Sequence, residues 1–131
     1  MEPTVDTYRA AASLRTALRH FSRRSEQVAR EEGLTPRQHL LLLLISGAPD
    51  GSERATVTDL ARRLALGQST VTELVRRAEA AGLVEREASA DDARVSWLRV
   101  TEEGGRRLAA VVARLGPERQ RLRDLLAQFD D

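Results

Sequence analysis

The sequence predicts a mainly α-helical (α+β) fold that carries one small β-hairpin. Apolar residues recur at helical spacing in long segments at both ends of the chain. Two short helical segments in the middle are separated by a tight turn, and an alternating pattern typical of strands follows them. The length of 131 residues fits one domain over residues 1–131, and because only 3% of the residues are aromatic, aliphatic side chains must fill its core.

The first segment predicts one long helix over about residues 4–32. Its apolar side chains from Val5 to Val28 fall at helical spacing, and no Gly or Pro interrupts it before Gly33. Globular helices usually have about three to four turns, and this one is about twice as long. A helix of this length extends beyond a small domain, so we expect it to pack on something else.

A second helix is predicted from Pro36 to about Ser46. Thr35 supplies a capping hydroxyl, and Pro36 stands at the first helical position. The run from Leu40 to Ile45 is apolar on every side, which predicts burial on most sides of the helix. This longest apolar run is far too short to cross a bilayer.

The middle of the chain predicts a helix, a turn and a second helix. We expect Thr58 to cap the first helix, which ends at Leu64, and residues 65–67 to form the turn. The second helix covers residues 68–81, and Gly82 suits the left-handed position that ends a helix. Its apolar stripe consists of Val71, Leu74, Val75 and Ala78.

A hairpin follows this second helix. We expect strands over residues 83–87 and 94–100 around a small, acidic tip. Alternation in the second strand puts Leu98 on one face and Trp97 on the other. Trp97 is either an exposed aromatic side chain or a contact with a neighbouring helix, and the sequence leaves both open.

Two amphipathic helices complete the chain. Thr101 is expected to cap the first of them, and Gly116-Pro117 breaks it before the second begins. Both carry an apolar stripe at helical spacing, so each should bury one face. In the last helix the stripe consists of Leu122, Leu125, Leu126 and Phe129.

Two short helices joined by a tight turn and followed by a hairpin form a winged helix-turn-helix. In that arrangement the second helix enters the major groove of DNA, and the hairpin reaches the backbone or the minor groove. The face opposite the apolar stripe carries short hydrogen-bonding groups and an Arg one turn later, which suit phosphates and base edges. A merely solvated helix face is the alternative. These exposed residues are Gln68, Ser69, Thr72, Glu73 and Arg76.

The chain resembles the MarR family of bacterial transcriptional regulators. The resemblance depends on the order and spacing of several short motifs and covers nearly the whole chain. They are LTP at 34–36, TDLARRL at 58–64, STVT at 69–72, AGLV at 81–84, DAR at 92–94, LRVTEEG at 98–104 and GPE at 116–118. Each motif is modest alone, and together they are specific.

The resemblance implies a homodimer in which residues 1–33 and 102–131 interlock and residues 34–101 form the DNA-binding lobe. It implies a repressor or activator, and we expect a repressor of a pseudo-palindromic, double-stranded operator. The wing Arg94 would enter the minor groove, and Asp92 would orient it. The recognition-helix residues that match the family are Gln68, Ser69, Thr70, Thr72 and Arg76.

Several positions depart from the family pattern. Ala65 stands where the turn usually has Gly, Gly67 replaces the usual capping Ser, and Glu73 stands where a basic or neutral residue is common. Between residues 55 and 101 there are seven Arg and seven acidic residues. Because this lobe is about neutral, counterion release should contribute little to affinity. Either affinity is low, or Arg residues outside the lobe add phosphate contacts.

A small aromatic or phenolic effector is a further implication of the resemblance. Relatives often bind small aromatic acids between the dimer region and the DNA-binding lobe. The side chains that could line such a cleft here are Tyr8, Arg15, Arg19 and His39. Ordinary core edge and surface is the alternative for all four, and the sequence leaves both open.

Other classes of protein fit the sequence less well. With no Cys and two His on different predicted helices, there is no nucleophile elbow, phosphate loop or metal-ligand spacing, so we expect no enzyme, metal or cofactor. The start of the chain lacks the pattern of a signal peptide, which favours the cytoplasm. A winged helix that binds only another protein is the competing hypothesis, because the lobe is neutral.

Overall fold

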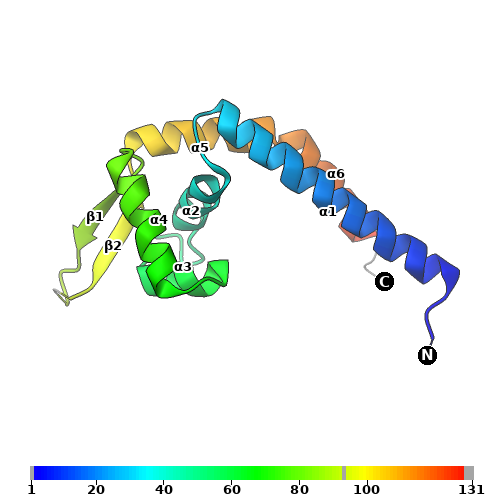
Figure 1. Cartoon of the computed structure of the whole chain (residues 1–131), viewed down its shortest axis with the longest axis horizontal. Coiled ribbons are helices and arrows are strands. Elements are labelled where there is room, and N and C mark those ends of the chain that lie inside the picture. The colour runs from blue at the N-terminus through cyan, green and yellow to red at the C-terminus, as the bar shows by residue number, and fades with distance from the viewer. Residues whose placement is uncertain (1, 93, 129–131) are drawn as a thin grey trace.

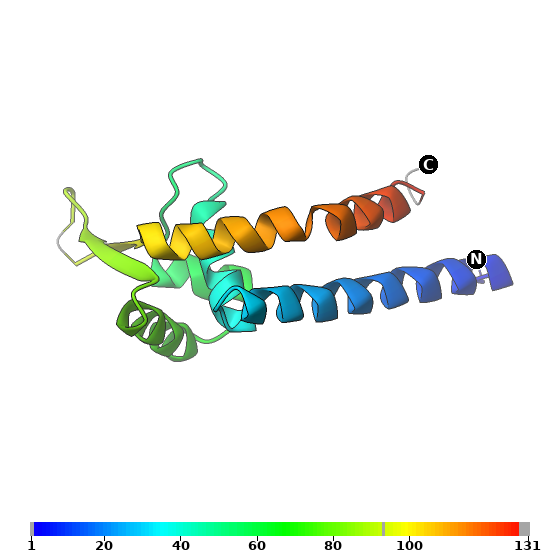
Figure 2. The same ribbon diagram turned by 90° about the horizontal axis from the view of Figure 1, so that it is seen from above.

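The computed structural model describes residues 2–92 and 94–128 and confirms the predicted fold class. A lobe is formed by α2 (Pro36–Ser46), α3 (Val57–Leu64), α4 (Gln68–Ala80) and the antiparallel strands β1 (Val84–Ala88) and β2 (Ser96–Val100). An elongated arm is formed by α1 (Val5–Glu31), α5 (Glu102–Arg114) and α6 (Gly116–Ala127). In the arm, α1 runs antiparallel beside α5 and α6, and both termini lie at its far end (Figures 1 and 2).

Helix α1 begins and ends where the sequence predicts. Thr4 and Thr7 form a reciprocal capping box at its start, and Gly33 takes a positive φ of 82° just after its end. Val28 and Ala29, at the end next to the lobe, are its buried residues. The remainder of the helix projects away from the lobe (Figure 2). Val5 and Leu18, in this part of the helix, are exposed.

Helix α2 crosses the middle of the lobe and contributes three fully buried side chains, Leu41, Leu42 and Ile45. The prediction that it is buried on most sides is confirmed, and the exception is the side where Leu40 is 47% exposed and Leu43 is also exposed. Neighbouring elements cover α2 only on the sides that face α1, α3, α4, α5 and β2. Periodicity identifies the helix as apolar all round, but only packing shows which side lacks a neighbour.

The first helix of the helix-turn-helix begins earlier than predicted. Thr56, not Thr58, is its N-cap: the Thr56 backbone is extended, and its hydroxyl accepts a hydrogen bond from the Asp59 amide at 3.1 Å. Thr58 therefore lies inside α3, where its hydroxyl accepts a hydrogen bond from the Gln68 side chain. The turn forms as predicted, and Ala65 adopts a left-handed conformation there with φ 56°.

The end of α4 matches the prediction for Gly82. Gly82 has φ 75°, its amide donates to the Glu79 carbonyl, and the Leu83 amide donates to the Ala78 carbonyl. These two bonds define a Schellman motif, which ends α4 and directs the chain into the hairpin.

The hairpin pairs Val84 with Val100 and Ala88 with Ser96, so its strands are one or two residues displaced from the predicted bounds. The sequence did not reveal that Ala55 pairs with the middle of β2. Ala55 and Leu98 exchange two backbone hydrogen bonds, at 3.1 and 2.8 Å. A third extended segment thereby ties β2 to the start of α3.

The C-terminal helices follow one another almost without interruption. Thr101 caps α5 as predicted, because its hydroxyl accepts from the Gly104 amide at 3.0 Å. Only Leu115 separates α5 from α6, and Pro117 stands in the first turn of α6, which explains the predicted break. The predicted stripe residue Phe129 lies outside the described residues. None of the described helices is long and apolar enough to span a membrane.

Candidate nucleic-acid interface

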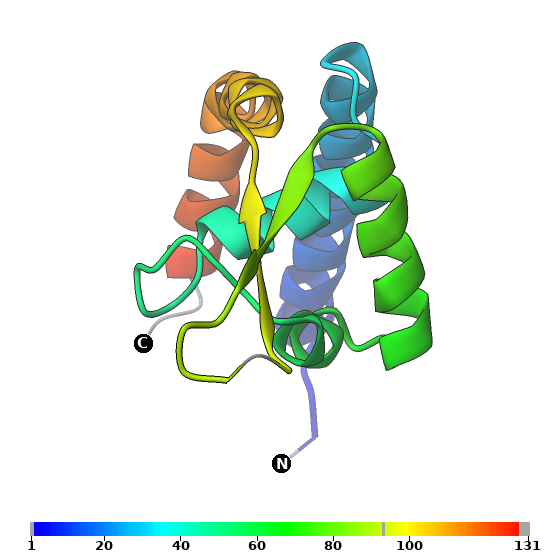
Figure 3. The same cartoon turned by 90° about the vertical axis from the view of Figure 1, so that its left-hand side faces the viewer.

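The candidate interface is the end of the lobe that faces away from α5. Figures 1 and 3 show that α3, the first turn of α4 and the turn end of the hairpin all lie there. Helix α4 buries Val71, Val75 and Ala78 against the core, as the apolar stripe predicts, while Leu74 is half-buried. Its outer face is exposed and carries Gln68, Ser69, Thr70, Thr72 and Arg76.

The first turn of α4 combines backbone and side-chain donors. Gly67 is the N-cap and offers no side chain to the first amides, so these amides remain available to an anion such as a phosphate. Ser69, Thr70 and Thr72 add hydroxyls beside them. The Gln68 amide nitrogen donates to the Thr58 hydroxyl at 3.1 Å, which links the start of α4 to α3.

Farther along α4, the Glu73 carboxylate holds two Arg side chains. Arg76 donates to it from Nε at 2.9 Å and from a terminal nitrogen at 2.5 Å, and Arg77 donates from Nε at 3.0 Å. Hydrogen bonds from Arg76 and then Arg77 lower the pKa of Glu73 to about 2. Glu73 is therefore charged at any physiological pH, and Arg76 is engaged within the protein rather than free.

On the wing, Asp92 and Arg94 are in direct contact. One Asp92 oxygen accepts from the Arg94 amide at 3.0 Å and from its guanidinium Nε at 3.3 Å. These bonds, the backbone one first, lower the pKa of Asp92. The Arg94 side chain is still 91% exposed, so it is oriented at its base and extends into solvent.

A polar groove that sequence reasoning missed lies between the wing and the start of α3. Its volume is about 400 Å³, and Arg86 and Arg94 line it together with Thr56, Thr58 and Ser96. Arg86, on β1, also bonds to Glu79 of α4 at 2.9 Å. In the sequence, only the alternation of Arg86 with Glu85 and Glu87 along the strand could have identified Arg86 as a candidate site residue.

The structure gives Trp97 a partner that neither sequence alternative named. The guanidinium carbon of Arg54 lies 4.2 Å from the centre of its indole ring, in a cation–π arrangement. Arg54 precedes Ala55, the residue that pairs with Leu98, so the stacking adds a second contact between this segment and β2.

The four predicted effector residues do not line one pocket of the chain. His39 is buried and lines a crevice of about 150 Å³ between α1 and α2, with Phe21, Ser25 and Pro36 among its neighbours. Burial lowers the pKa of His39. Tyr8, Arg15 and Arg19 do not line this crevice: Tyr8 is 63% exposed and stands 13 residues, about 20 Å of helix, before Phe21.

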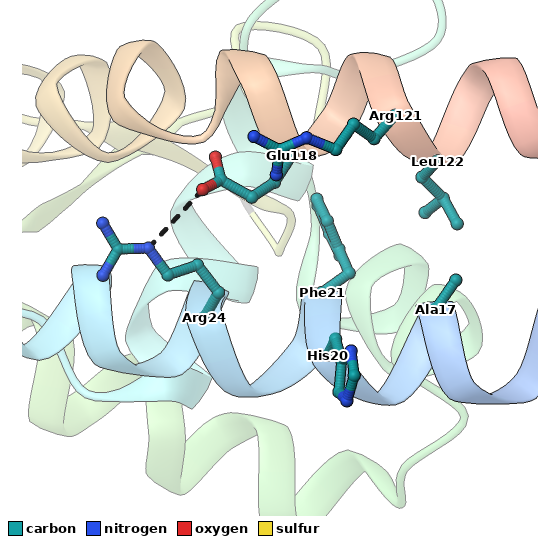
Figure 4. Close-up of a pocket in the computed structure, with 7 residues that line it drawn as sticks. All are labelled: Ala17, His20, Phe21, Arg24, Glu118, Arg121 and Leu122. Atoms are coloured by element: carbon teal, nitrogen blue, oxygen red, sulfur yellow. Dashed lines mark ion pairs between the residues drawn. The ribbon is translucent and has the colours of Figure 1, made fainter.

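A larger cavity, of about 350 Å³, lies between α1 and α6 (Figure 4). Phe21 and Leu122 form apolar walls, and Arg24 approaches Glu118 with an Nε to Oε1 distance of 3.6 Å. The other carboxylate oxygen of Glu118 is buried and accepts no hydrogen bond within the described part of the chain. The arm is thus incompletely packed in a single protomer.

Comparison with known proteins supports one family. The model of the MarR family matches residues 32–95, which contain the whole helix-turn-helix and the first strand of the hairpin. Comparison with curated proteins finds no significant match.

Solved structures of similar fold cover more of the chain than the family model does. A MarR family transcription regulator is 26% identical, with a TM-score of 0.70 over 82% of this chain and 69% of its own. AbsC, a MarR family transcriptional regulator from Streptomyces coelicolor, is 23% identical, with a TM-score of 0.72 over 93% and 81%. A mutant MarR from E. coli complexed with operator DNA is 18% identical, with a TM-score of 0.72 over 99% and 94%. In its motifs, its fold and these comparisons, the chain is similar to the MarR family of winged-helix regulators.

Proposed function

We propose that this protein is a sequence-specific, double-stranded-DNA-binding transcriptional regulator that acts as a homodimer on a pseudo-palindromic operator. The single observation that carries the proposal is the exposed polar face of α4, with an uncapped first turn, beside a wing that extends Arg94 into solvent. The likeness in fold to E. coli MarR complexed with operator DNA supports it.

Each part of the interface has its own role in the proposed complex. Helix α4 enters the major groove, where its first amides, Ser69, Thr70 and Thr72 bind phosphates, and Gln68 and Arg76 approach base edges. Arg94 enters the adjacent minor groove, where narrow A·T-rich sequence has the strongest negative potential. Asp92 limits the directions that the Arg94 side chain can take.

The arm supports a dimer. Helix α6 contains no buried residue in one protomer, although Leu122, Leu125 and Leu126 form its apolar stripe. Together with the exposed apolar residues of α1, this surface needs a second copy to cover it. We therefore propose residues 1–33 and 102–131 as dimerisation helices and residues 34–101 as the DNA-binding lobe, with two recognition helices about one DNA turn apart.

We further propose that the protein is a cytoplasmic repressor that leaves DNA when it binds a small aromatic or phenolic effector. The crevice beside His39, between the arm and the lobe, is the most suitable site because Phe21, Pro36 and Leu40 line it next to a buried imidazole whose pKa is lowered by burial. Tyr8, Arg15 and Arg19 would contribute only from the arm of a second protomer.

A protein-binding winged helix without DNA affinity is the second candidate function. One observation favours it: each of the seven Arg between residues 55 and 101 forms an ion pair with an acidic side chain of the lobe. Such a surface attracts phosphates weakly.

Selection of bound duplexes from a random pool with the purified protein separates the two candidates. A DNA-binding regulator enriches one pseudo-palindromic motif, and the double variant Ser69→Ala/Thr72→Ala loses the enrichment. The variant Arg123→Ala, on the exposed face of α6, is the matched control and should enrich the same motif. A pool that stays random with the wild-type protein would contradict the proposed function.

A further inference from the structure

Glu73 is an acidic residue in the middle of the surface proposed to read DNA. We infer that Glu73 determines specificity: it holds Arg76 and Arg77 away from phosphates, so that α4 binds DNA well only where base edges replace the opened ion pairs. This inference depends on the proposed DNA binding. It also explains why the DNA-binding lobe carries as many acidic residues as arginines.

The geometry shows that one carboxylate occupies both cationic side chains. Arg76, one turn after Glu73, uses two nitrogens on both carboxylate oxygens, and Arg77 shares one of these oxygens. Two-pronged pairs of this kind are the strongest and most directional that Arg forms with a carboxylate. The Arg76 and Arg77 side chains are nevertheless 66% and 70% exposed, so solvent and DNA have access to them.

Because the pairs are exposed, they are weak enough for DNA to break. Ion pairs on a protein surface are screened and contribute little to stability. A phosphate can therefore compete for either Arg, but the Glu73 charge then remains next to the DNA backbone and repels it. Glu73 thus opposes non-specific contacts without preventing movement of the arginines.

Base edges differ from phosphates in the hydrogen-bond partners that they provide for Glu73 and Arg76. The cytosine amino group can donate to a carboxylate in the major groove, and the guanine edge accepts two bonds from a released Arg. At a sequence that presents both, Glu73 and Arg76 each find a partner, so the opening of their own pair costs little. At other sequences Glu73 has no donor, and this difference produces discrimination.

The rest of the lobe shows why Glu73 is the residue to test. The other acidic residue of α4, Glu79, pairs with Arg86 of the wing. Asp59 pairs with Arg62 and Arg63 on α3. Among these acids, Glu73 alone holds two arginines of the proposed recognition helix.

The experiment compares Glu73→Gln with Glu85→Gln. Both changes remove one negative charge from the lobe and preserve the side-chain shape. Glu85, on β1, is exposed and takes part in no ion pair among the residues that the structure describes, so only Glu73→Gln releases Arg76 and Arg77. Each protein is titrated at several salt concentrations with two duplexes. One is the duplex that the wild type enriches from a random pool, and the other is a scrambled duplex of the same composition.

Glu73→Gln should bind the scrambled duplex about tenfold more tightly than the wild type at ~0.1 M salt, with a salt slope steeper by about one to two units. Its preference for the selected duplex should fall by a similar factor. Glu85→Gln should change neither the preference nor the slope by as much. Thermal melting of all three proteins checks that the fold is unchanged.

Equal slopes and equal preferences for the two variants would overturn the inference, and so would a Glu73→Gln variant that binds both duplexes more weakly. A wild-type protein that prefers no duplex at all would instead contradict the proposed function, which separates the two failures.

Discussion

Gly104, in the first turn of α5, packs directly against the carbonyl group of Leu83, which lies between α4 and β1. A Cβ at residue 104 would overlap the Leu83 carbonyl oxygen and lie 2.9 Å from a methyl carbon of Val100. The Thr101 hydroxyl, which caps the same turn, also donates to the Gly82 carbonyl at 2.6 Å. The arm is therefore attached to the base of the wing through a backbone contact that only glycine permits.

Gly104→Ala should destabilise the protein by about 1–3 kcal/mol, because the contact is with the Leu83 backbone, which cannot move aside, and with a methyl group of the half-buried Val100. Gly105→Ala, one residue later, is the control. A Cβ there meets nothing within 4 Å, so the substitution should stabilise α5 by about 0.5–1 kcal/mol. Urea unfolding of the two variants measures both effects, and equal stabilities would show that the close contact is absent.

Ala65→Gly should raise the free energy of unfolding by up to about 1 kcal/mol. The left-handed conformation of Ala65 costs about 1–2 kcal/mol, from which the greater flexibility of unfolded glycine must be subtracted. Ala80→Gly, at the exposed end of α4, is the matched control and should lose up to about 1 kcal/mol. Chemical denaturation distinguishes the two signs, and a decrease at both positions would contradict the left-handed turn.

His39 should make stability depend on pH near neutrality. Burial lowers the pKa of the folded imidazole below the ordinary 6.5, so at acid pH the unfolded chain binds more protons than the folded one. The free energy of unfolding should then be highest above about pH 6.5 and decrease as the pH falls below this value. His39→Gln should reduce that decrease and the exposed control His20→Gln should not, as measured by denaturation between about pH 5 and pH 7.5.

Arg94→Ala should weaken DNA binding across all sequences and make the salt slope shallower by about one unit for each phosphate that the wing no longer neutralises. Arg76→Ala should instead cost roughly 1–3 kcal/mol at particular base pairs, because in the proposed complex its guanidinium binds a base edge. The two variants are titrated with one selected operator and its single-base variants at several salt concentrations. Affinity and slope equal to the wild type for Arg94→Ala would mean that this side chain only pairs with Asp92.

Replacing both Leu125 and Leu126 with Glu should abolish the dimer. Neither side chain is buried within the single chain, and in the proposed dimer a second copy covers both, in an interface on the order of 2,000 Å². Sedimentation at micromolar concentration should give a dimer for the wild type and for the control Arg123→Glu, and a monomer or unfolded chain for the double variant. A stable wild-type monomer would refute an obligate dimer.

The sequence by itself determined most of the fold, because the signals that start and end helices are local. Each of these signals lies within about four residues of the helix end that it sets, so it can be recognised directly in the sequence. Examples are Thr35 with Pro36, Gly82 and Thr101. The same locality identified the exposed face of α4, since a stripe of buried residues defines the opposite side of a helix.

Tertiary structure decided what depends on residues far apart in the chain. Four features depend on contacts that no periodic pattern encodes. They are the position of Thr58 beside Gln68, the pairing of Ala55 with Leu98, the stacking of Arg54 on Trp97 and the exposed side of α2. The distribution of charge is a similar case. Counting established that the lobe is neutral, but only side-chain geometry shows that Glu73 engages both Arg76 and Arg77, because electrostatic interaction depends on distance rather than on composition.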